Sequence, residues 1–298
     1  MRVVYSDQYD LRLGAHVFQS VKYRLTKEKL LQDGVISEAD LVAPATASDA
    51  DIALVHHPDY ILKLKTGNLS AEEILRMEVP YSPELIHAVW LAAGGSILAG
   101  RVALRERVGV NLTGGFHHAY PGHGEGFCVI HDVAVAIRRL QKDEEIDRAM
   151  VIDCDVHQGN GTAAIFRDDG SVFTFSIHQE RNYPYPKPPS DLDVNLDDGV
   201  GDDEYLAALE QGLEWSLTRF RPDLIFYLAG ADPYWEDQLG GLKLTLQGLI
   251  ERDELVFERA AEGEIPVVVT LAGGYARHVA DTVQIHANTV RTAKEFAS

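Results

Sequence analysis

Seven short apolar segments constrain the fold of this chain more than any other feature of its sequence. Most are continuous apolar runs, without the alternation of apolar and polar residues that marks a strand with one solvated face. A continuous run is typical of a strand covered on both faces, as in a parallel sheet between two layers of helices. We expect strands at "RVVYS" near residue 2, "DIALVH" near 51, "VGVNL" near 108, "AMVID" near 149, "SVFTFSI" near 171, "DLIFYLAG" near 223 and "IPVVVTLAGG" near 265.

Three longer stretches between these runs have helical periodicity. They cover residues 82–107, 202–220 and 245–263. The first begins with Ser82, a good N-cap residue, followed by Pro83, which is favoured at the first helical position. Strands and helices therefore alternate along the chain. This order predicts an α/β fold, a three-layer open parallel sheet with helices on both faces.

The chain is predicted to form one domain over residues 1–298. Its 298 residues are 46% hydrophobic, which is enough for one large core. The longest irregular segment, "NYPYPKPPSDLD" at 182–193, is too short to be a domain linker. Aromatic residues interleave with its prolines, so we interpret it as a rigid surface loop, a kind of segment that often carries function.

The charge of the chain excludes some partners. There are 46 acidic and 27 basic residues, for a formal net charge of −19. Such a surface repels phosphate backbones, so we expect no direct binding of nucleic acid. An acidic surface can attract cationic ligands such as lysine-bearing peptides or polyamines, or it can simply keep the protein soluble.

Cysteine usage and hydropathy indicate a cytoplasmic protein. Cys128 and Cys154 both lie among apolar residues, which suits buried thiols better than a disulfide framework. The start of the sequence lacks a basic region followed by an apolar run, so we expect no signal peptide. No window approaches 18 uninterrupted apolar residues, so we expect no membrane span.

Polar residues follow the predicted strands, where ligands bind in open parallel sheets. In "VIDCDVHQGNG", Asp153, Asp155 and His157 occupy every second position and project to one side if the chain stays extended. Two carboxylates this close repel each other unless a cation or a hydrogen-bond donor lies between them. Asp155, His157 and Asp232, which follows another strand, are a suitable set for a catalytic zinc ion. A buried carboxylate–histidine pair without metal is the alternative.

Two further segments carry candidate catalytic groups. His117 and His118 follow two glycines, and a neutral imidazole beside the expected metal site is a competent general base. A second pair, His56 and His57, precedes Pro-Asp, which indicates a helix start and a structural role. Tyr275 follows two glycines at a strand end, where a phenol can donate to a developing oxyanion or simply pack in an interface.

Taken together, these motifs resemble the histone deacetylase superfamily, and most of all its class IV group and their bacterial relatives. The resemblance extends over nearly the whole chain, from "VYSDQYD" to "GGYARHVADT". The strings that carry it are "GGFHHAYPGHGEGFC", "IDCDVHQGNGT", "AGADPYWEDQLGGL", "RDELVF" and "LAGGY", together with "AHVFQSVKYRL" and "YSPEL". The resemblance implies the arginase–deacetylase type of α/β fold. It also implies hydrolysis of an N-acyl amide, typically on a lysine side chain.

The resemblance implies that Asp155, His157 and Asp232 bind Zn²⁺, while Tyr275 polarises the carbonyl of the substrate. Zinc would activate both the water and the amide as a Lewis acid. Fe²⁺ is possible in the cell, because mixed nitrogen and oxygen sites discriminate poorly among divalent metals. The family also often holds a structural K⁺ or Na⁺ near the Asp153–His157 turn.

The two histidines are expected to flank the reacting water. The resemblance implies that Asp153 bonds to His117 and that Asn160 is the partner of His118, which takes the proton from water and passes it to the leaving amine. Some classes have Asp at the position of Asn160. We therefore expect the protonated form of His118 to be stabilised less in this chain than in those classes, because an amide replaces a carboxylate.

The substrate channel is expected to be lined by Gly126 and Phe127, with Tyr183 or its neighbours opposite. Polyamine deacetylases of the superfamily carry a Glu near the mouth of the channel. Leu239 stands at the matching position here, which disfavours polyamine specificity despite the acidic composition.

Three hypotheses about function follow. The first is a zinc-dependent deacylase of acyl-lysine in a peptide or protein, and the second is a deacylase of a small acylated amine or metabolite. The third is a non-catalytic acyl-lysine-binding scaffold, which His117, His118 and Tyr275 disfavour because a binder needs neither a base nor an oxyanion donor. The sequence leaves open the length of the acyl chain, the physiological substrate, the oligomeric state and the divalent metal used in the cell.

Overall fold

All strands of the computed structural model, which describes residues 1–297, belong to one sheet. The sheet has eight strands in the order β2-β1-β3-β8-β7-β4-β5-β6, and every neighbouring pair is parallel. The strands are β1 Arg2–Val4, β2 Leu41–Val42, β3 Val108–Asn111, β4 Ala149–Asp153, β5 Val172–Gln179, β6 Leu192–Leu196, β7 Leu224–Leu228 and β8 Val267–Thr270. Every residue of β3, β4, β5, β7 and β8 is buried, as their continuous apolar runs predict.

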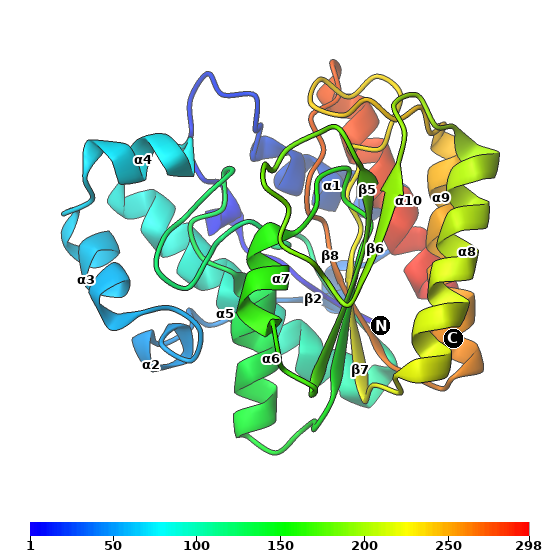
Figure 1. The fold of residues 1–298 in the computed structure, drawn as a ribbon, viewed down its shortest axis with the longest axis horizontal. Coiled ribbons are helices and arrows are strands. Elements are labelled where there is room, and N and C mark those ends of the chain that lie inside the picture. Colours follow the sequence, from blue (N-terminus) through cyan, green and yellow to red (C-terminus); the bar gives the residue numbers. More distant parts are fainter. Residues whose placement is uncertain (298) are drawn as a thin grey trace.

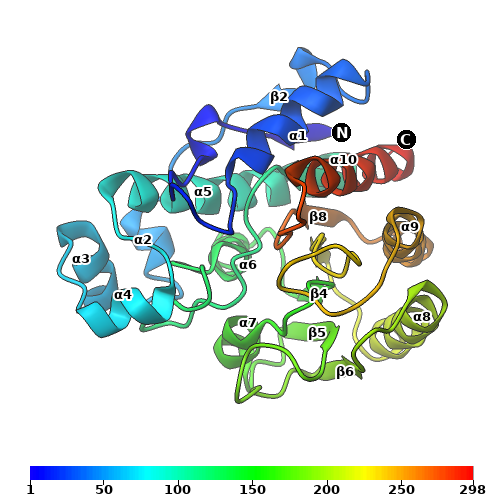
Figure 2. The same cartoon turned by 90° about the horizontal axis from the view of Figure 1, so that it is seen from above.

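Helices cover both faces of the sheet, and the predicted three-layer arrangement is confirmed. Helices α8, α9 and α10 pack on one face, and α5, α6 and α7 lie on the other (Figures 1 and 2). The helices are α1 Val21–Gln32, α2 Asp49–Ile52, α3 Pro58–Thr66, α4 Ala71–Met77, α5 Pro83–Glu106, α6 Asp132–Lys142, α7 Asn160–Phe166, α8 Asp202–Arg219, α9 Leu246–Glu262 and α10 Val279–Phe296.

Helix α5 confirms the helix predicted from Ser82 onward. The Ser82 hydroxyl accepts a 3.0 Å hydrogen bond from the backbone of Leu85, which caps the helix start. Within residues 1–297, α5 is the one helix whose length and hydropathy would suffice to cross a membrane, but 83% of its apolar window is buried inside the protein. It therefore has the character of a core helix.

The prediction of a strand near residue 51 is wrong. Residues Asp49–Ile52 form the short helix α2, because Ser48 and Asp51 make a reciprocal capping box that outweighs the apolar run after them. Two edge strands, β2 and β6, were not predicted. Strand β2 has only two residues, and β6 is only partly buried, so neither has the continuous apolar run that marks the central strands.

The order of the strands decides where a site can form. Strands β3, β8, β7 and β4 are consecutive neighbours in the middle of the sheet. They run parallel, so the segments after their carboxyl ends meet above one edge. These are the four segments whose polar residues the sequence singled out.

Candidate active site

The three predicted metal ligands lie together at this edge. Asp155 and His157 lie in the turn between β4 and α7, and Asp232 lies in the segment after β7. All three are buried, and one potential ligand atom from each lies within 4.8 Å of the others. Nδ1 of His157 lies 3.0 Å from Oδ1 of Asp155 and 3.5 Å from Oδ2 of Asp232. The three donors therefore converge on one point.

The electrostatics of this cluster fit a divalent cation. Burial and the adjacent Asp155 carboxylate raise the pKa of Asp232 to about 7. Oδ2 of Asp232 is buried and accepts no hydrogen bond from residues 1–297. The two carboxylates overcome the effect of burial and raise the pKa of His157 to about 10. A divalent metal would take the place of that proton and satisfy the oxygen, and a nitrogen with two carboxylate oxygens is a donor set that zinc accepts.

Backbone groups orient both carboxylates. The N–H of Gly273 donates to Oδ2 of Asp155 at 2.9 Å, and the N–H of Val156 donates to Oδ1 of Asp232 at 2.9 Å. Gly273 is required for this approach, because a Cβ atom there would lie only 2.8 Å from Cγ of Asp232 and closer still to an oxygen of each carboxylate. Glycine thus lets the segment after β8 reach the cluster.

The two predicted catalytic histidines lie above the cluster with separate partners. Nδ1 of His117 lies 2.7 Å from Oδ2 of Asp153, and Nδ1 of His118 lies 2.7 Å from Oδ1 of Asn160. Both pairings are those that the resemblance implies. The imidazole centroids are 4.0 Å apart.

The different partners give the two imidazoles opposite protonation. Burial opposes the charge on His117, but the carboxylates of Asp153 and Asp155 outweigh it and raise its pKa to about 9. His118 has an amide partner instead of a carboxylate. Burial and the neighbouring His117 and His157 hold the pKa of His118 well below its usual value. His118 is therefore the neutral imidazole of the pair, the form that accepts a proton.

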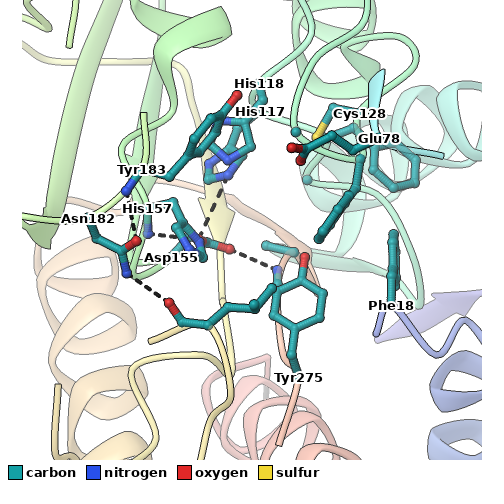
Figure 3. A pocket seen from close by; sticks show the side chains of 17 residues that line it. Phe18, Glu78, His117, His118, Cys128, Asp155, His157, Asn182, Tyr183 and Tyr275 are labelled. Atoms are coloured by element: carbon teal, nitrogen blue, oxygen red, sulfur yellow. Dashed lines mark hydrogen bonds and ion pairs between the residues drawn. The ribbon is translucent and has the colours of Figure 1, made fainter. Parts of the chain in front are cut away.

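Tyr275 closes the opposite side of the site. Its hydroxyl points into the cavity on the side of Asp155 (Figure 3). The Asp237 carboxylate accepts a 2.6 Å hydrogen bond from the backbone N–H of Tyr275 and also binds the backbone of Leu239 and Gly240. Burial and the charge of Asp155 raise the pKa of Tyr275 well above its usual value, so its hydroxyl keeps its proton as a donor.

A buried lysine supports the same segment from below. Nζ of Lys22 donates to the carbonyls of Ala272 and Gly274 at 3.1 and 3.4 Å, and it lies 5.4 Å from the centre of the Tyr275 ring. Burial lowers the pKa of Lys22 to about 8, against the carboxylates of Asp232, Asp155 and Asp237, which raise it. The segment that carries Tyr275 is thus fixed through its backbone from both sides.

A cavity of about 250 Å³ leads from the surface to this cluster. Gly126, Phe127 and Tyr183 line it, in the positions expected for the substrate channel. Phe18, which the sequence did not single out, packs edge-on against Tyr275 at 5.9 Å and forms another wall. Aromatic faces therefore surround the passage, which suits an apolar acyl chain and the methylenes of a lysine.

Leu239 also lines the cavity, as does Glu78. Glu78 is exposed, so it lies near the mouth of the cavity, and its carboxylate points inward (Figure 3). Partial burial, together with the charge of Glu125, raises the pKa of Glu78. The sequence did not single out Glu78, because an acidic residue at the end of a surface helix is ordinary.

Three residues with clear roles in the geometry lack any individual signal in the sequence. Lys22, Asp237 and Glu125 act through contacts with distant parts of the chain, so only their inclusion in motif strings pointed toward them. Asp237 lies in the polar segment after β7, and Glu125 precedes the Gly126–Phe127 pair.

The second histidine pair lies outside this site. His57 is the N-cap of α3, which confirms the helix start predicted at Pro58. His56 is buried between two backbone groups. Its Nε2 accepts from the N–H of His131 at 2.9 Å, and its Nδ1 donates to the carbonyl of Tyr120 at 3.0 Å.

Comparison with known proteins connects this geometry to one family. The histone deacetylase domain matches residues 16–290. An uncharacterized protein of Picosynechococcus sp. is 40% identical over 98% of this chain and 98% of its own length. Histone deacetylase 2 of Arabidopsis thaliana is 33% identical over 95% of this chain and 77% of its own, and the acetoin utilization protein AcuC of Bacillus subtilis is 30% identical over 82% and 69%.

Solved structures agree with the fold. A crystal structure of an HDAC homolog complexed with SAHA superposes with a TM-score of 0.84 at 25% identity, over 99% of this chain and 84% of that one. The HD domain of HDA15 superposes with a TM-score of 0.81 at 22% identity, over 98% and 90%. The second likeness concerns the fold alone. The predicted arginase–deacetylase type of architecture is confirmed.

Proposed function

This chain belongs to the histone deacetylase family and is a deacetylase, and from this premise we propose that it is a zinc-dependent deacylase of N-acyl-lysine side chains. One observation carries the proposal. The buried group of Asp155, His157 and Asp232 lies at the end of the same cavity into which His118 and Tyr275 face. A metal site, a neutral base and a phenol donor thus share one reaction volume.

Asp155, His157 and Asp232 would hold the metal. A divalent cation there would supply Lewis-acid activation of water and of the amide carbonyl. Zn²⁺ is our proposal because of the donor set, and Fe²⁺ is the competing occupant. A structural K⁺ or Na⁺ near the Asp153–His157 turn stays a prediction.

His118 acts as the general base and acid. Its Nδ1–H is held by Asn160 at 2.7 Å, so Nε2 is the nitrogen free to take a proton from the attacking water. The same nitrogen then protonates the leaving amine of lysine. His117, held by Asp153, orients the water and stabilises negative charge beside it.

Tyr275 stabilises the oxyanion that develops on the substrate carbonyl. The phenol donates one hydrogen bond, and the hydrogen bonds that its backbone makes with Asp237 and Gln238 hold it in place before the substrate binds. The arrangement favours catalysis over simple binding, because a scaffold gains nothing from a neutral base and an oxyanion donor together.

The shape of the cavity favours a substrate that inserts its acylated amide as far as the metal site. Phe127 and Tyr183 would contact the lysine methylenes, since both line the passage. Leu239 offers an apolar side chain where a carboxylate would select a polyamine. The length of the acyl chain is set by how the end of the cavity accommodates it, and a panel of chain lengths tests this directly.

A small acylated amine is the second candidate substrate. The carboxylate of Glu78 near the mouth favours it, because a free ammonium group on the remainder of the substrate would be attracted there (Figure 3). The amide of a small acylated amine would be hydrolysed in the same way as that of an acyl-lysine peptide. The two substrates differ only in the part of the molecule that stays outside the cavity.

We place the chain closest to class IV, on the strings "AHVFQSVKYRL" and "RDELVF". We also propose a cytoplasmic location, which the two free and buried cysteines, Cys128 and Cys154, support.

Fluorogenic acetyl-, trifluoroacetyl- and long-acyl-lysine peptides test the function, each with and without a chelator, alongside small acylated amines. We expect cleavage of a peptide that stops with chelator and returns with added Zn²⁺. Cleavage of small amines alone would favour the second candidate. Absence of any chelator-sensitive cleavage, with peptide binding retained, would favour a scaffold and contradict the proposal.

A further inference from the structure

Glu125 lies directly behind the partner of the general base. Its Oε1 accepts a 2.7 Å hydrogen bond from Nδ2 of Asn160 and a 2.8 Å hydrogen bond from the hydroxyl of Tyr183. Asn160 in turn binds His118. A continuous chain of side chains therefore runs from His118 through Asn160 to Glu125 and returns to the cavity wall at Tyr183.

The contacts of Asn160 define the orientation of its amide. Its Oδ1 receives two N–H groups, from Nδ1 of His118 at 2.7 Å and from the backbone of Gly161 at 3.1 Å. Its Nδ2 faces the Glu125 carboxylate, which can only accept. A flipped amide would set its NH₂ against these N–H donors and its oxygen against a carboxylate, so the flipped state is strongly disfavoured.

Asn160 also connects His118 to a negative charge, because its amide binds the imidazole on one side and the Glu125 carboxylate on the other. An amide cannot balance an imidazolium as a carboxylate does, and in this chain the first partner of His118 is an amide. Glu125 places a carboxylate one residue further out, hydrogen-bonded to the far side of that amide. The carboxylate polarises the amide, so Oδ1 becomes a better acceptor when His118 carries a proton.

The second arm of Glu125 shapes the cavity. The Tyr183 ring packs edge-on against His118, with centroids 4.9 Å apart at 86°. Its hydroxyl is held by Glu125, which precedes the turn that carries Gly126 and Phe127. One carboxylate thus connects the wall of the cavity with the partner of the base.

We propose that Glu125 is a positioning residue for catalysis, which holds Asn160 in the orientation that fixes His118 and supplies the negative charge that stabilises the His118 imidazolium. This inference rests on the proposed function of His118 as general base. A carboxylate is required at position 125, and not merely a side chain that fills space.

A purely structural role is the alternative. The other oxygen of Glu125 lies 3.3 Å from Nε2 of His123, so the side chain could serve a surface ion pair. The variant His123→Gln removes that contact and leaves Asn160 untouched, which makes it the matched control. We expect its kcat and KM to equal those of the wild type.

The kinetic test uses residues 1–298 loaded with zinc and the best peptide substrate. Glu125→Gln keeps the shape and can keep the hydrogen bond from Asn160, but it removes the charge. We expect kcat to fall about tenfold or more, because the charge behind the base is lost. We expect KM to stay within about twofold, because the glutamine oxygen can still accept the hydrogen bond from Tyr183 that holds the cavity wall. A kcat for Glu125→Gln equal to that of the wild type would overturn the role of the charge.

Moving the carboxylate from position 125 to position 160 is expected to restore the activity that Glu125→Gln loses. In the double variant Asn160→Asp with Glu125→Gln, the carboxylate touches His118 directly and the amide lies outside it. We expect kcat to recover to at least half of the wild-type value. A double variant as slow as Glu125→Gln would show that position 125 acts through something other than charge on His118.

A third measurement does not depend on activity. In the zinc-loaded protein labelled with ¹⁵N-histidine, the Nδ1–H resonance of His118 reports its hydrogen bond to Asn160, and the Asn160→Ala variant assigns it. We expect Glu125→Ala to shift or broaden this resonance and His123→Gln to leave it unchanged. An unchanged resonance in Glu125→Ala would overturn the orienting role.

These measurements separate the inference from the function on which it rests. A wild-type protein without chelator-sensitive hydrolysis of any acyl-lysine peptide would contradict the proposed function. The resonance of His118 would then still decide whether Glu125 orients Asn160. If Glu125→Ala does not fold, Glu125→Gln replaces it in the same spectrum, where the loss of charge is expected to shift the resonance.

Discussion

The backbone N–H of Gly273 donates a 2.9 Å hydrogen bond to Oδ2 of Asp155, a residue 118 positions earlier in the chain. This contact joins the segment after β8 to the segment after β4 across the sheet. It leaves no room for a side chain at position 273, because the carboxylates of Asp155 and Asp232 occupy that space. The metal site therefore depends on a residue that offers no ligand atom.

Gly273→Ala is expected to weaken metal binding. The added methyl group would displace both carboxylates, and the loss of geometry at a metal site weakens affinity about tenfold to a hundredfold or more. Metal content after dialysis against limiting Zn²⁺ measures this. Gly170→Ala is the matched control, because a Cβ atom at Gly170 meets nothing within 4 Å among the described residues. Full metal occupancy in Gly273→Ala would show that the site does not need this close backbone approach.

Asp232→Ala is expected to reduce the bound metal from one ion per chain to a small fraction. Two protein donors remain, and removing one ligand from a set of three leaves a weak site. Elemental analysis of the purified protein gives the stoichiometry, and the melting temperature in Zn²⁺ gives a second reading, since a ligand bound only to the native state raises it. The exposed Asp203, changed to Ala, serves as control. A stoichiometric metal in Asp232→Ala would remove this residue from the ligand set.

Tyr275→Phe is expected to keep the metal and lose most turnover. The ring contacts with Phe18 and Phe127 remain, and only the phenol donor is removed. The loss of one oxyanion donor typically lowers kcat about a hundredfold to a thousandfold. Steady-state kinetics with parallel metal analysis measures both properties. Tyr185→Phe, in an exposed residue, is the control. Near wild-type turnover in Tyr275→Phe would exclude the phenol from the mechanism.

The buried imidazole of His56 is expected to lower the free energy of unfolding as the pH falls below 6.5. Burial lowers its pKa from 6.5 to about 4 in the folded protein, against the hydrogen bonds that its ring donates to backbone carbonyls, which raise it. As the pH falls from 6.5 to 4, the unfolded chain gains a proton on this residue while the folded chain does not. The free energy of unfolding therefore decreases, by about 3 kcal/mol at most. Above pH 6.5 this residue contributes no pH dependence.

The variant His56→Gln isolates this effect. Glutamine can accept the hydrogen bond from His131 but cannot be protonated. Urea unfolding at pH values between 4 and 7 is expected to show a shallower pH dependence for His56→Gln than for the wild type. His87→Gln, at an exposed histidine, is expected to leave the slope unchanged. Parallel curves for His56→Gln and the wild type would contradict the burial argument.

The central part of the fold is readable in the sequence because its signals are local. Strands β4 and β7 are continuous apolar runs, and α5 has its own cap and proline at its start. The edge strand β6 has no such run, because only one of its residues is fully buried. Near residue 51, the Ser48 capping box decided for a helix where apolar content alone suggested a strand.

The candidate ligands and catalytic groups are readable for a related reason. Asp155, His157, Asp232 and Tyr275 each follow a strand that the sequence predicts, and parallel strands bring their carboxyl ends to one edge. The pairings of His117 with Asp153 and of His118 with Asn160 came from the family resemblance. The structure places both pairs at 2.7 Å.

By itself, then, the sequence determined the layered α/β architecture and the residues that can carry the chemistry, since both depend on local periodicity and on the short segments after strands. Only the tertiary structure decided the supporting contacts: Lys22 with Ala272 across 250 positions, Glu125 with Tyr183 across 58, and Gly273 with Asp155 across 118. Contacts of this kind are made between backbone and side-chain groups on segments that meet only after the sheet has formed. Their partners depend on strand order and loop path, neither of which is encoded in the residues on either side of them.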